Sequence, residues 1–415
     1  MIQITHKIAT AIATSALLLQ AVAPLAYAET TVTLSGNGSS SDNDANVSQN
    51  NTTNVVQTNN ANVSNYVSGT ASTGGNDAND NTGGDVAIRT GDAQSSVNVS
   101  NTLNKNVADV NSCNCEGDTT VTIEGNGSRS DNDVRLYKNS DINVFQTNNA
   151  SVYNSVDADA KTGDNDANRN TGGDTTIYTG DASTNVSVST TANANLARVG
   201  GGNGNGGEVN AIIDGNGSYS DNDIYLNLDR DITLVQDNYA WVYNWVDANA
   251  NTGYNDANDN TGGDVAIRTG DAQAWVGVDN LVNFNSADVD CGCVFDGKFK
   301  IEGNGYDSDN DIRAHLNDTQ NLFQDNYNWT DNYVDAHAKT GDNDARRNTG
   351  PVHSPDPVVI ITGDANQGVS VQTTANKNVI GSDSFHLPDG VEFDFDFNGL
   401  WDWWFLHIGG SHSSS

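Results

Sequence analysis

The chain has 415 residues and a formal net charge of −36, with 54 acidic residues against 18 basic ones. A partner such as nucleic acid or an anionic membrane requires a basic surface, so this charge argues against both. Nearly all the acidic residues are aspartate, which favours turns over helices, and the hydrophobic share of 35% lies below that of a typical globular protein.

The first 28 residues have the pattern of a secretory signal peptide. A basic start precedes an apolar run over 8–23, Pro24 and the small-residue site Ala26-Tyr27-Ala28. The run is short and interrupted by polar residues, which favours a cleaved signal over a membrane anchor, and no later segment is apolar enough to span a bilayer. We therefore expect a secreted protein, extracellular or at the cell surface, whose mature chain has no transmembrane segment.

Four copies of one repeat form most of the remaining chain. The motif Gly-Asn-Gly recurs at Gly36, Gly125, Gly215 and Gly303, with spacings of 89, 90 and 88 residues. Apolar and β-branched residues alternate with polar ones at a period of two, between clusters of Gly, Asn and Asp, which is typical of β-strands. We place the four copies and a C-terminal tail at residues 29–118, 119–207, 208–297, 298–380 and 381–415.

This pattern predicts an all-β fold, an elongated β-solenoid or tandem β-repeat array of four copies of about 89 residues. A solenoid turn of about 22 residues would give roughly sixteen rungs and a rod of about 75 Å along the stack, at a spacing of about 4.8 Å. The alternative is four separate β-sandwich domains.

One strand of the third copy shows how its two faces divide. Ala240, Val242, Asn244 and Val246 share a face that we expect to form the core, with the asparagines of successive copies stacked as a ladder. The opposite face is aromatic in the third and fourth copies, and is either a second packing layer or a binding surface. Its residues are Tyr239, Trp241, Tyr243, Trp245, Tyr327, Trp329 and Tyr333.

Aspartates recur in tight turns beside glycine, where hard oxygen ligands suit Ca²⁺. We predict structural calcium sites, with turn capping through backbone hydrogen bonds as the alternative. One set lies in Asp-Asn-Asp turns, at Asp42, Asp44, Asp131, Asp133, Asp221, Asp223, Asp309 and Asp311. The other set lies in two further turns of each copy, at Asp77, Asp166, Asp256, Asp344, Asp92, Asp181, Asp271 and Asp364.

Two Cys-x-Cys pairs follow the first and third copies. In an exported chain they predict disulfides rather than a zinc site, with the connectivity left open. The residues are Cys113, Cys115, Cys291 and Cys293.

The tail concentrates aromatic residues near its end. Such a segment either caps the last rung of a solenoid or docks onto another subunit or surface partner. The residues that we assign to this role are Trp401, Trp403, Trp404 and Phe405.

The segment 73–107, TGGNDANDNTGGDVAIRTGDAQSSVNVSNTLNKNV, resembles repeats of uncharacterised secreted surface proteins from candidate-phylum bacteria that are rich in Asn, Asp, Gly and Thr. This resemblance implies secretion and surface display. A weaker likeness links residues 43–49, NDANVSQ, to the Asn-x-Ala-x-x-x-Gln rhythm of curlin-type repeats, and it implies a stacked β-architecture.

No motif of a serine hydrolase, zinc protease or phosphate loop occurs, and after the signal every histidine lies from His315 onward, outside the repeated motifs. We therefore expect a non-enzymatic structural or adhesive protein, stabilised by calcium and able to form filaments. Its expected partners are further copies of itself, neighbouring surface proteins or glycans. One alternative is a carbohydrate-binding protein that uses the Tyr/Trp face, and a less favoured one is an ice-binding solenoid.

Overall fold

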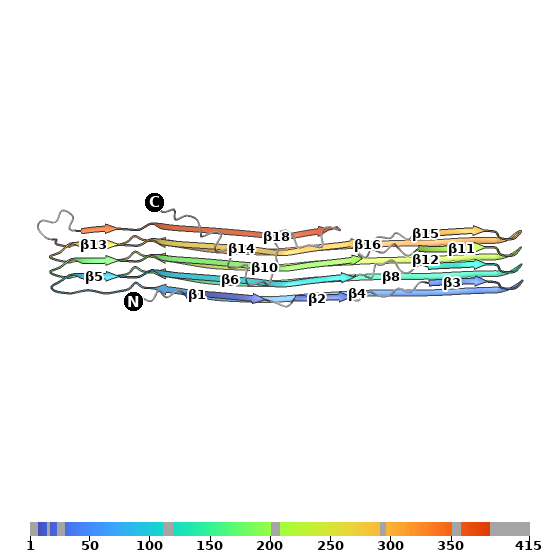
Figure 1. Cartoon of the computed structure of the whole chain (residues 1–415), viewed down its shortest axis with the longest axis horizontal. Coiled ribbons are helices and arrows are strands. Elements are labelled where there is room, and N and C mark those ends of the chain that lie inside the picture. The colour runs from blue at the N-terminus through green and yellow to red at the C-terminus, as the bar shows by residue number, and fades with distance from the viewer. Residues whose placement is uncertain are drawn as a thin grey trace, which may run out of the picture.

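The structure is a computed structural model that describes residues 7–14, 17–22, 30–110, 119–200, 208–290, 296–350 and 358–381. Within these ranges every regular element is a β-strand, which confirms the predicted all-β class. Each copy of the repeat forms one rung, and the four rungs stack on one another (Figure 1).

Every rung has the same four strands in the same order. The first rung consists of β3 (Thr30–Ser35), β4 (Asp42–Ser72), β5 (Val86–Arg89) and β6 (Ala93–Val110). The second consists of β7 (Thr119–Glu124), β8 (Asp131–Lys161), β9 (Thr175–Tyr178) and β10 (Ala182–Gly200). The third consists of β11 (Glu208–Asp214), β12 (Asp221–Asn251), β13 (Val265–Arg268) and β14 (Ala272–Asp290). The fourth consists of β15 (Asp296–Glu302), β16 (Asp309–Lys339), β17 (Val358–Ile361) and β18 (Ala365–Ile380).

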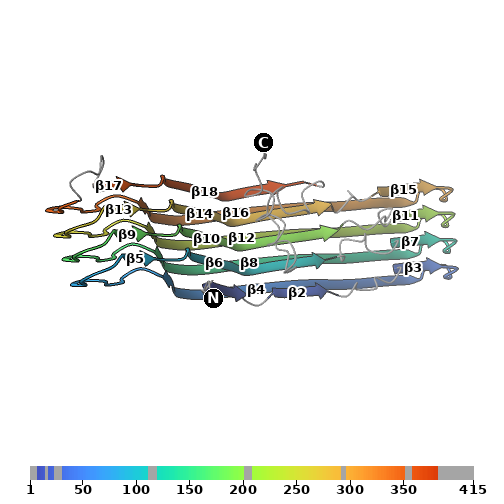
Figure 2. The same ribbon diagram turned by 60° about the vertical axis from the view of Figure 1, so that its left-hand side comes forward.

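Equivalent strands of successive rungs pair in parallel and in register, so each sheet takes one strand from every copy. The sheets run β3-β7-β11-β15, β4-β8-β12-β16, β5-β9-β13-β17 and β6-β10-β14-β18 (Figure 2). Two further strands, β1 (Lys7–Thr14) and β2 (Leu17–Val22), pair in parallel with the outer edge of β6. Sheets shared among all copies exclude four separate sandwich domains.

The predicted rung of about 22 residues is wrong, because one rung takes a whole repeat. The strand β4 continues for 31 residues through polar clusters that favour turns when only neighbours in sequence are considered. It continues because its backbone pairs with the next rung along its whole length, and several of its inward amides bond to the same residue there, as Asn65 does to Asn154. At about 3.3 Å per residue such a strand spans roughly 100 Å, whereas four rungs about 4.8 Å apart are far thinner. The long axis therefore lies along the strands.

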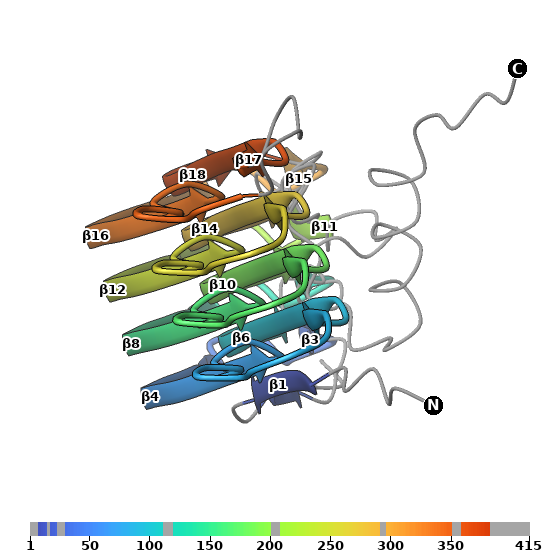
Figure 3. The same ribbon diagram turned by 90° about the vertical axis from the view of Figure 1, so that its left-hand side faces the viewer.

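The core lies between the sheet of long strands and the sheets that face it (Figure 3). Val97 of β6 packs with Val156 of β8 in one cluster, and Ile123 of β7 packs with Leu136 of β8 in another. The expected core face of β12 is confirmed, since Ala240, Val242, Asn244 and Val246 are fully buried.

Buried amides form ladders along the stack. Asn65, Asn154 and Asn244 each donate from Nδ2 to Oδ1 of the asparagine in the next rung, at 2.7 Å. Gln236 Nε2 donates to Gln146 Oε1 at 2.7 Å and also to the Ser286 carbonyl at 3.0 Å. The predicted asparagine ladder is confirmed, and such ladders satisfy amides that would otherwise be costly to bury.

Candidate functional site

An aromatic strip lies on the outer face of β12 and β16, defined by Tyr239, Trp241, Tyr243, Trp245, Tyr327, Trp329 and Tyr333. Strand alternation places these side chains opposite the buried core face. Trp241 is 40% exposed and Tyr333 is 58% exposed, so the strip is a surface and not a second packing layer. The Tyr239 and Tyr327 rings stack with centroids 4.9 Å apart, and those of Trp241 and Trp329 lie 6.1 Å apart.

A line of tyrosines extends the strip across the whole stack. Tyr66, Tyr153, Tyr243 and Tyr333 come from the four rungs, with successive ring centroids 5.4, 5.3 and 5.4 Å apart. Sequence analysis missed Tyr66 and Tyr153, because Tyr66 pairs with Ser155 rather than with a tyrosine. The rung register pairs Tyr153 directly with Tyr243, whereas Tyr66 meets Tyr153, and Tyr243 meets Tyr333, diagonally.

The predicted metal ligands form carboxylate ladders, in which the same aspartate of each rung lies above its equivalent. The Asp-Asn-Asp motifs are not turns as predicted: each begins a long strand, because its residues pair in register with those of the next rung. Burial, followed by the carboxylates of Asp133 and Asp221, raises the pKa of Asp131. Burial and the carboxylates of Asp256 and Asp77 likewise raise the pKa of Asp166. The ladders at 42/131/221/309, 44/133/223/311 and 77/166/256/344 thus hold like charges one strand spacing apart.

One of these ladders borders a shallow groove. Its lining includes Asp133, Asp223 and Asp311, together with the side chain of Tyr225. The outer two carboxylates have arginine partners within their own rungs, and Arg135 Nη2 lies 2.9 Å from Asp133 Oδ2. In the third rung a tyrosine takes the place of that arginine, and burial followed by neighbouring carboxylates raises the pKa of Asp223.

A fourth ladder accepts hydrogen bonds from backbone N–H groups of the next rung, and it consists of Asp92, Asp181, Asp271 and Asp364. The N–H of Asp181 donates to Asp92 Oδ1 at 2.9 Å. In the same way the N–H of Asp271 donates to Asp181 Oδ1, and that of Asp364 to Asp271 Oδ1, each at 2.8 Å. This is the capping role given above as the alternative to calcium, acting between rungs rather than within one turn. Asp85 accepts the N–H of Asp174 in the same way, at 3.1 Å, and sequence analysis missed it.

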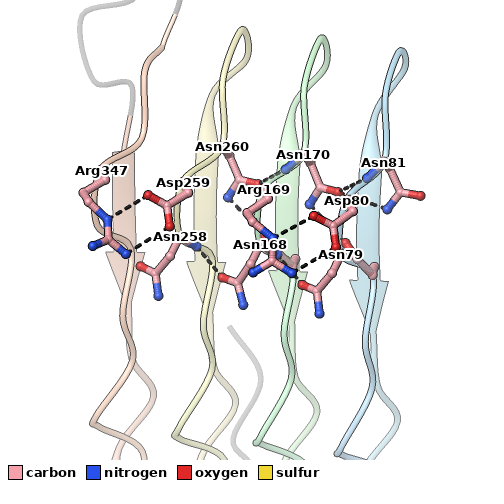
Figure 4. Close-up of polar contacts among 12 residues, drawn as sticks. Asn79, Asp80, Asn81, Asn168, Arg169, Asn170, Asn258, Asp259, Asn260 and Arg347 are labelled. Atoms are coloured by element: carbon pink, nitrogen blue, oxygen red, sulfur yellow. Dashed lines mark hydrogen bonds and ion pairs between the residues drawn. The ribbon is translucent and has the colours of Figure 1, made fainter.

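Asp and Arg alternate along another ladder, at Asp80, Asp259, Arg169 and Arg347 (Figure 4). Arg169 donates from Nε and Nη2 to the two oxygens of Asp80 at 2.7 and 2.9 Å, and Arg347 binds Asp259 at 2.7 and 3.0 Å. The hydrogen bonds from Arg169 hold the pKa of Asp80 below its usual value. Sequence analysis missed this ladder, although aligning the four copies shows the alternation.

The remaining predicted residues fall outside the ranges that the structure describes. These are the four cysteines, at Cys113, Cys115, Cys291 and Cys293, and the tail residues Trp401, Trp403, Trp404 and Phe405. In the described ranges, no group of three or more His, Cys, Asp or Glu side chains converges as a metal site.

The carboxylate ladders predict an unusual dependence of stability on pH. Asp131, Asp166, Asp223 and Asp256 have pKa values raised above the ordinary 3.8, so just above that pH the folded state binds more protons than the unfolded chain. The free energy of unfolding should therefore fall as pH rises through this window. We expect a higher Tm at about pH 4.5 than at about pH 7.5 in calcium-free buffer.

The double substitution Asp166→Asn with Asp256→Asn should raise the Tm at neutral pH and weaken its dependence on pH. Thermal melts followed by circular dichroism measure both effects. A Tm that climbs steadily from pH 4.5 to 7.5 in the unsubstituted chain would contradict the prediction.

Among the described residues there is no helix with the length and apolar character to cross a bilayer. No family model, curated protein or solved structure matches this chain.

Proposed function

We propose that this chain is an exported, non-enzymatic structural protein of the cell surface or extracellular matrix, and that it adheres through its aromatic strip. The observation that carries the proposal is the exposure of the strip on two adjacent strands. Exposed apolar patches of this kind mark interaction sites in soluble proteins. Aromatic side chains also offer a large contact area with a polar edge, which suits protein and glycan partners.

The scaffold beneath the strip supports this role. Amide ladders and in-register strands hold Trp241 and Trp329 on neighbouring rungs, so the two side chains lose little conformational entropy on binding. Alternate residues of one strand lie about 6.6 Å apart, so rings along and across the strands form a grid. Sugar rings or aromatic side chains of a neighbouring protein can stack on such a grid.

Removing two rings of the strip should abolish adhesion while the fold is kept. We expect Trp241→Ala with Trp329→Ala to weaken binding to the surface partner at least about tenfold, since buried aromatic anchors contribute on the order of 2 kcal/mol each. Trp275→Ala is the matched control, because Trp275 is 49% exposed but lies on β14, outside the strip. The number of intact cells retained on a surface coated with the protein measures the effect.

A carbohydrate-binding protein is the second candidate, favoured by the ring-to-ring spacing of the strip. A glycan array separates the two functions. Binding to one glycan class that Trp241→Ala removes supports the carbohydrate-binding candidate, whereas adhesion without glycan binding supports a protein partner. Equal adhesion by the double variant and the parent chain would refute both.

We also propose that calcium stabilises the stack by binding between rungs at the carboxylate ladders. Burial, followed by repulsion from neighbouring carboxylates, raises the pKa of Asp166 and Asp256, and a cation there would offset the repulsion. Backbone carbonyls and water would complete the coordination, as in other flexible calcium sites.

Calcium should raise the Tm at neutral pH. Sites with dissociation constants of about 0.1–1 mM, occupied at about 10 mM calcium, would each contribute roughly 1–3 kcal/mol. Magnesium at the same concentration controls for ionic strength, since it demands tighter octahedral geometry. An identical melt in EDTA and in calcium would exclude the proposal.

A further inference from the structure

Among the residues that the structure describes, none covers the fourth-rung end of the stack. Val369 and Val371 of β18 pair with Val276 and Val278 of β14, yet they are 51% and 46% exposed where their partners are 3% and 2% exposed. Among the described strands, β15, β16, β17 and β18 each have a neighbour only in the third rung. This end therefore presents both core side chains and free strand edges, which are ready to pair with another chain.

The contact between the second and third rungs indicates what could bind at this end, because the first rung resembles the third and the fourth resembles the second. Residues 76–94 of the first rung are identical to residues 255–273 of the third. Residues 339–348 of the fourth rung differ from 161–170 of the second only by arginine in place of asparagine at one position. The two segments overlap at residues 76–81 of the first rung and 343–348 of the fourth. There, a first rung placed on a fourth rung would meet the surface that the third rung meets on the second, except that Arg346 stands in place of Asn168.

The alternating Asp–Arg ladder fixes the direction of such a contact. An even number of rungs leaves Asp80 at one end of the ladder and Arg347 at the other (Figure 4). A first rung on a fourth rung brings Asp80 beside Arg347, which repeats the attraction of Arg169 to Asp259 inside the chain.

We propose that a second copy of this chain stacks its first rung on the fourth rung, in register and head to tail, so that copies build a polar filament. The proposal rests on the structural part of the proposed function and does not require the aromatic strip to bind a partner.

At the other end of the stack, β1 and β2 occupy the edge of β6 that a second copy would need. Residues 7–14 and 17–22 pair with β6 along positions 95–102 and 105–110, where β18 of a preceding copy would lie. Stacking on β6 requires these residues to leave, and removal of the proposed signal peptide would free the edge. The four rungs themselves begin at Thr30. Filaments should therefore form from the chain that starts at Glu29 and not from the chain that keeps residues 1–28.

A single methyl group at Gly341 tests the contact without disturbing the fold. At Gly163 and Gly253 an added Cβ would meet the glycine carbonyl of the next rung, at 1.8 and 1.9 Å. The equivalent Cβ at Gly341 meets nothing within 4 Å in one chain, but in a filament it would meet Gly74 of the next copy. Gly341→Ala should keep the parent Tm and weaken stacking at least about 100-fold, because it creates at the junction the clash that Gly163→Ala would create between rungs.

Gly277→Ala is the matched control, because Gly277 lies in β14 and its added Cβ also meets nothing within 4 Å. Filament length by negative-stain microscopy and association by analytical ultracentrifugation, both from the chain starting at Glu29, measure stacking. A parent chain that stays monomeric up to its solubility limit, or a Gly341→Ala variant that stacks like the parent, would overturn the proposal.

A charge exchange tests the direction. Asp80→Arg alone and Arg347→Asp alone each place like charges at every junction, so each should assemble several-fold more weakly than the parent, as expected for exposed charge pairs. Mixed one to one, the two variants restore opposite charges at every junction of a filament in which they alternate, and they should assemble again. Failure of mixing to restore assembly would reject the head-to-tail arrangement. Trp241→Ala with Trp329→Ala should stack normally, which separates this proposal from adhesion.

Discussion

Replacing Gly163 by alanine should separate the second and third rungs and lower the free energy of unfolding by at least about 3 kcal/mol. An added Cβ would lie 1.8 Å from the carbonyl oxygen of Gly253, which is far inside van der Waals contact. Both groups belong to backbone held by ladders on either side, so no side-chain movement can relieve the clash. Urea denaturation of the purified chain measures the loss.

Gly341→Ala is the internal control for this effect, because it places the same methyl group at the same position of the repeat in the last rung. It meets nothing within 4 Å, so the midpoint of urea denaturation should stay at the parent value. Equal midpoints for the two variants would mean that the rungs do not stack as closely as the structure shows.

Asn195→Ala should have the second large effect, a loss of about 2–4 kcal/mol. The Asn195 amide is fully buried and donates to Oδ1 of Asn238 and Asn285, each at 3.0 Å. Its Oδ1 accepts hydrogen bonds from Asn106 at 3.0 Å and Asn148 at 2.8 Å. Alanine would remove all four bonds at once and leave a cavity among buried amides, which is costly because water does not replace the lost partners.

Asn143→Ala is the comparison, since Asn143 donates to Asn54 Oδ1 at 3.0 Å on the exposed side of the same stack. Water can replace that bond, so we expect a loss below about 0.5 kcal/mol. Calorimetric melts of both variants test the difference. Similar losses at the two sites would show that burial does not govern the strength of these ladders.

Several features of the fold follow from local patterns that a single copy contains. The period of two in Ala240, Val242, Asn244 and Val246 predicts the buried face and places the aromatic residues opposite it, whereas the exposure of those residues is known only from the structure. Asparagine on that face predicts a ladder, because its amide needs a partner that an apolar core lacks. These predictions hold because they depend on one strand and its immediate surroundings.

The size of the rung could not be predicted in this way. Asparagine, serine and glycine clusters within β4 are typical of turns when only neighbours in sequence are considered. Their real partners lie about 89 residues away, as with Asn65 and Asn154. In the candidate site, the same long-range register determines that Asp92 accepts a backbone N–H hydrogen bond and that Asp80 pairs with Arg169. The sequence of one copy contains no information on either pairing.

The parallel, in-register pairing of the long strands also has a mechanical consequence. Hydrogen bonds between β4, β8, β12 and β16 lie across the strands, whereas the long axis of the molecule runs along them. A pull that slides one rung lengthwise past the next would therefore load all the bonds of a 31-residue strand together, in shear. A pull that peels one strand end away would break them one after another. The protein should resist lengthwise tension far better than peeling.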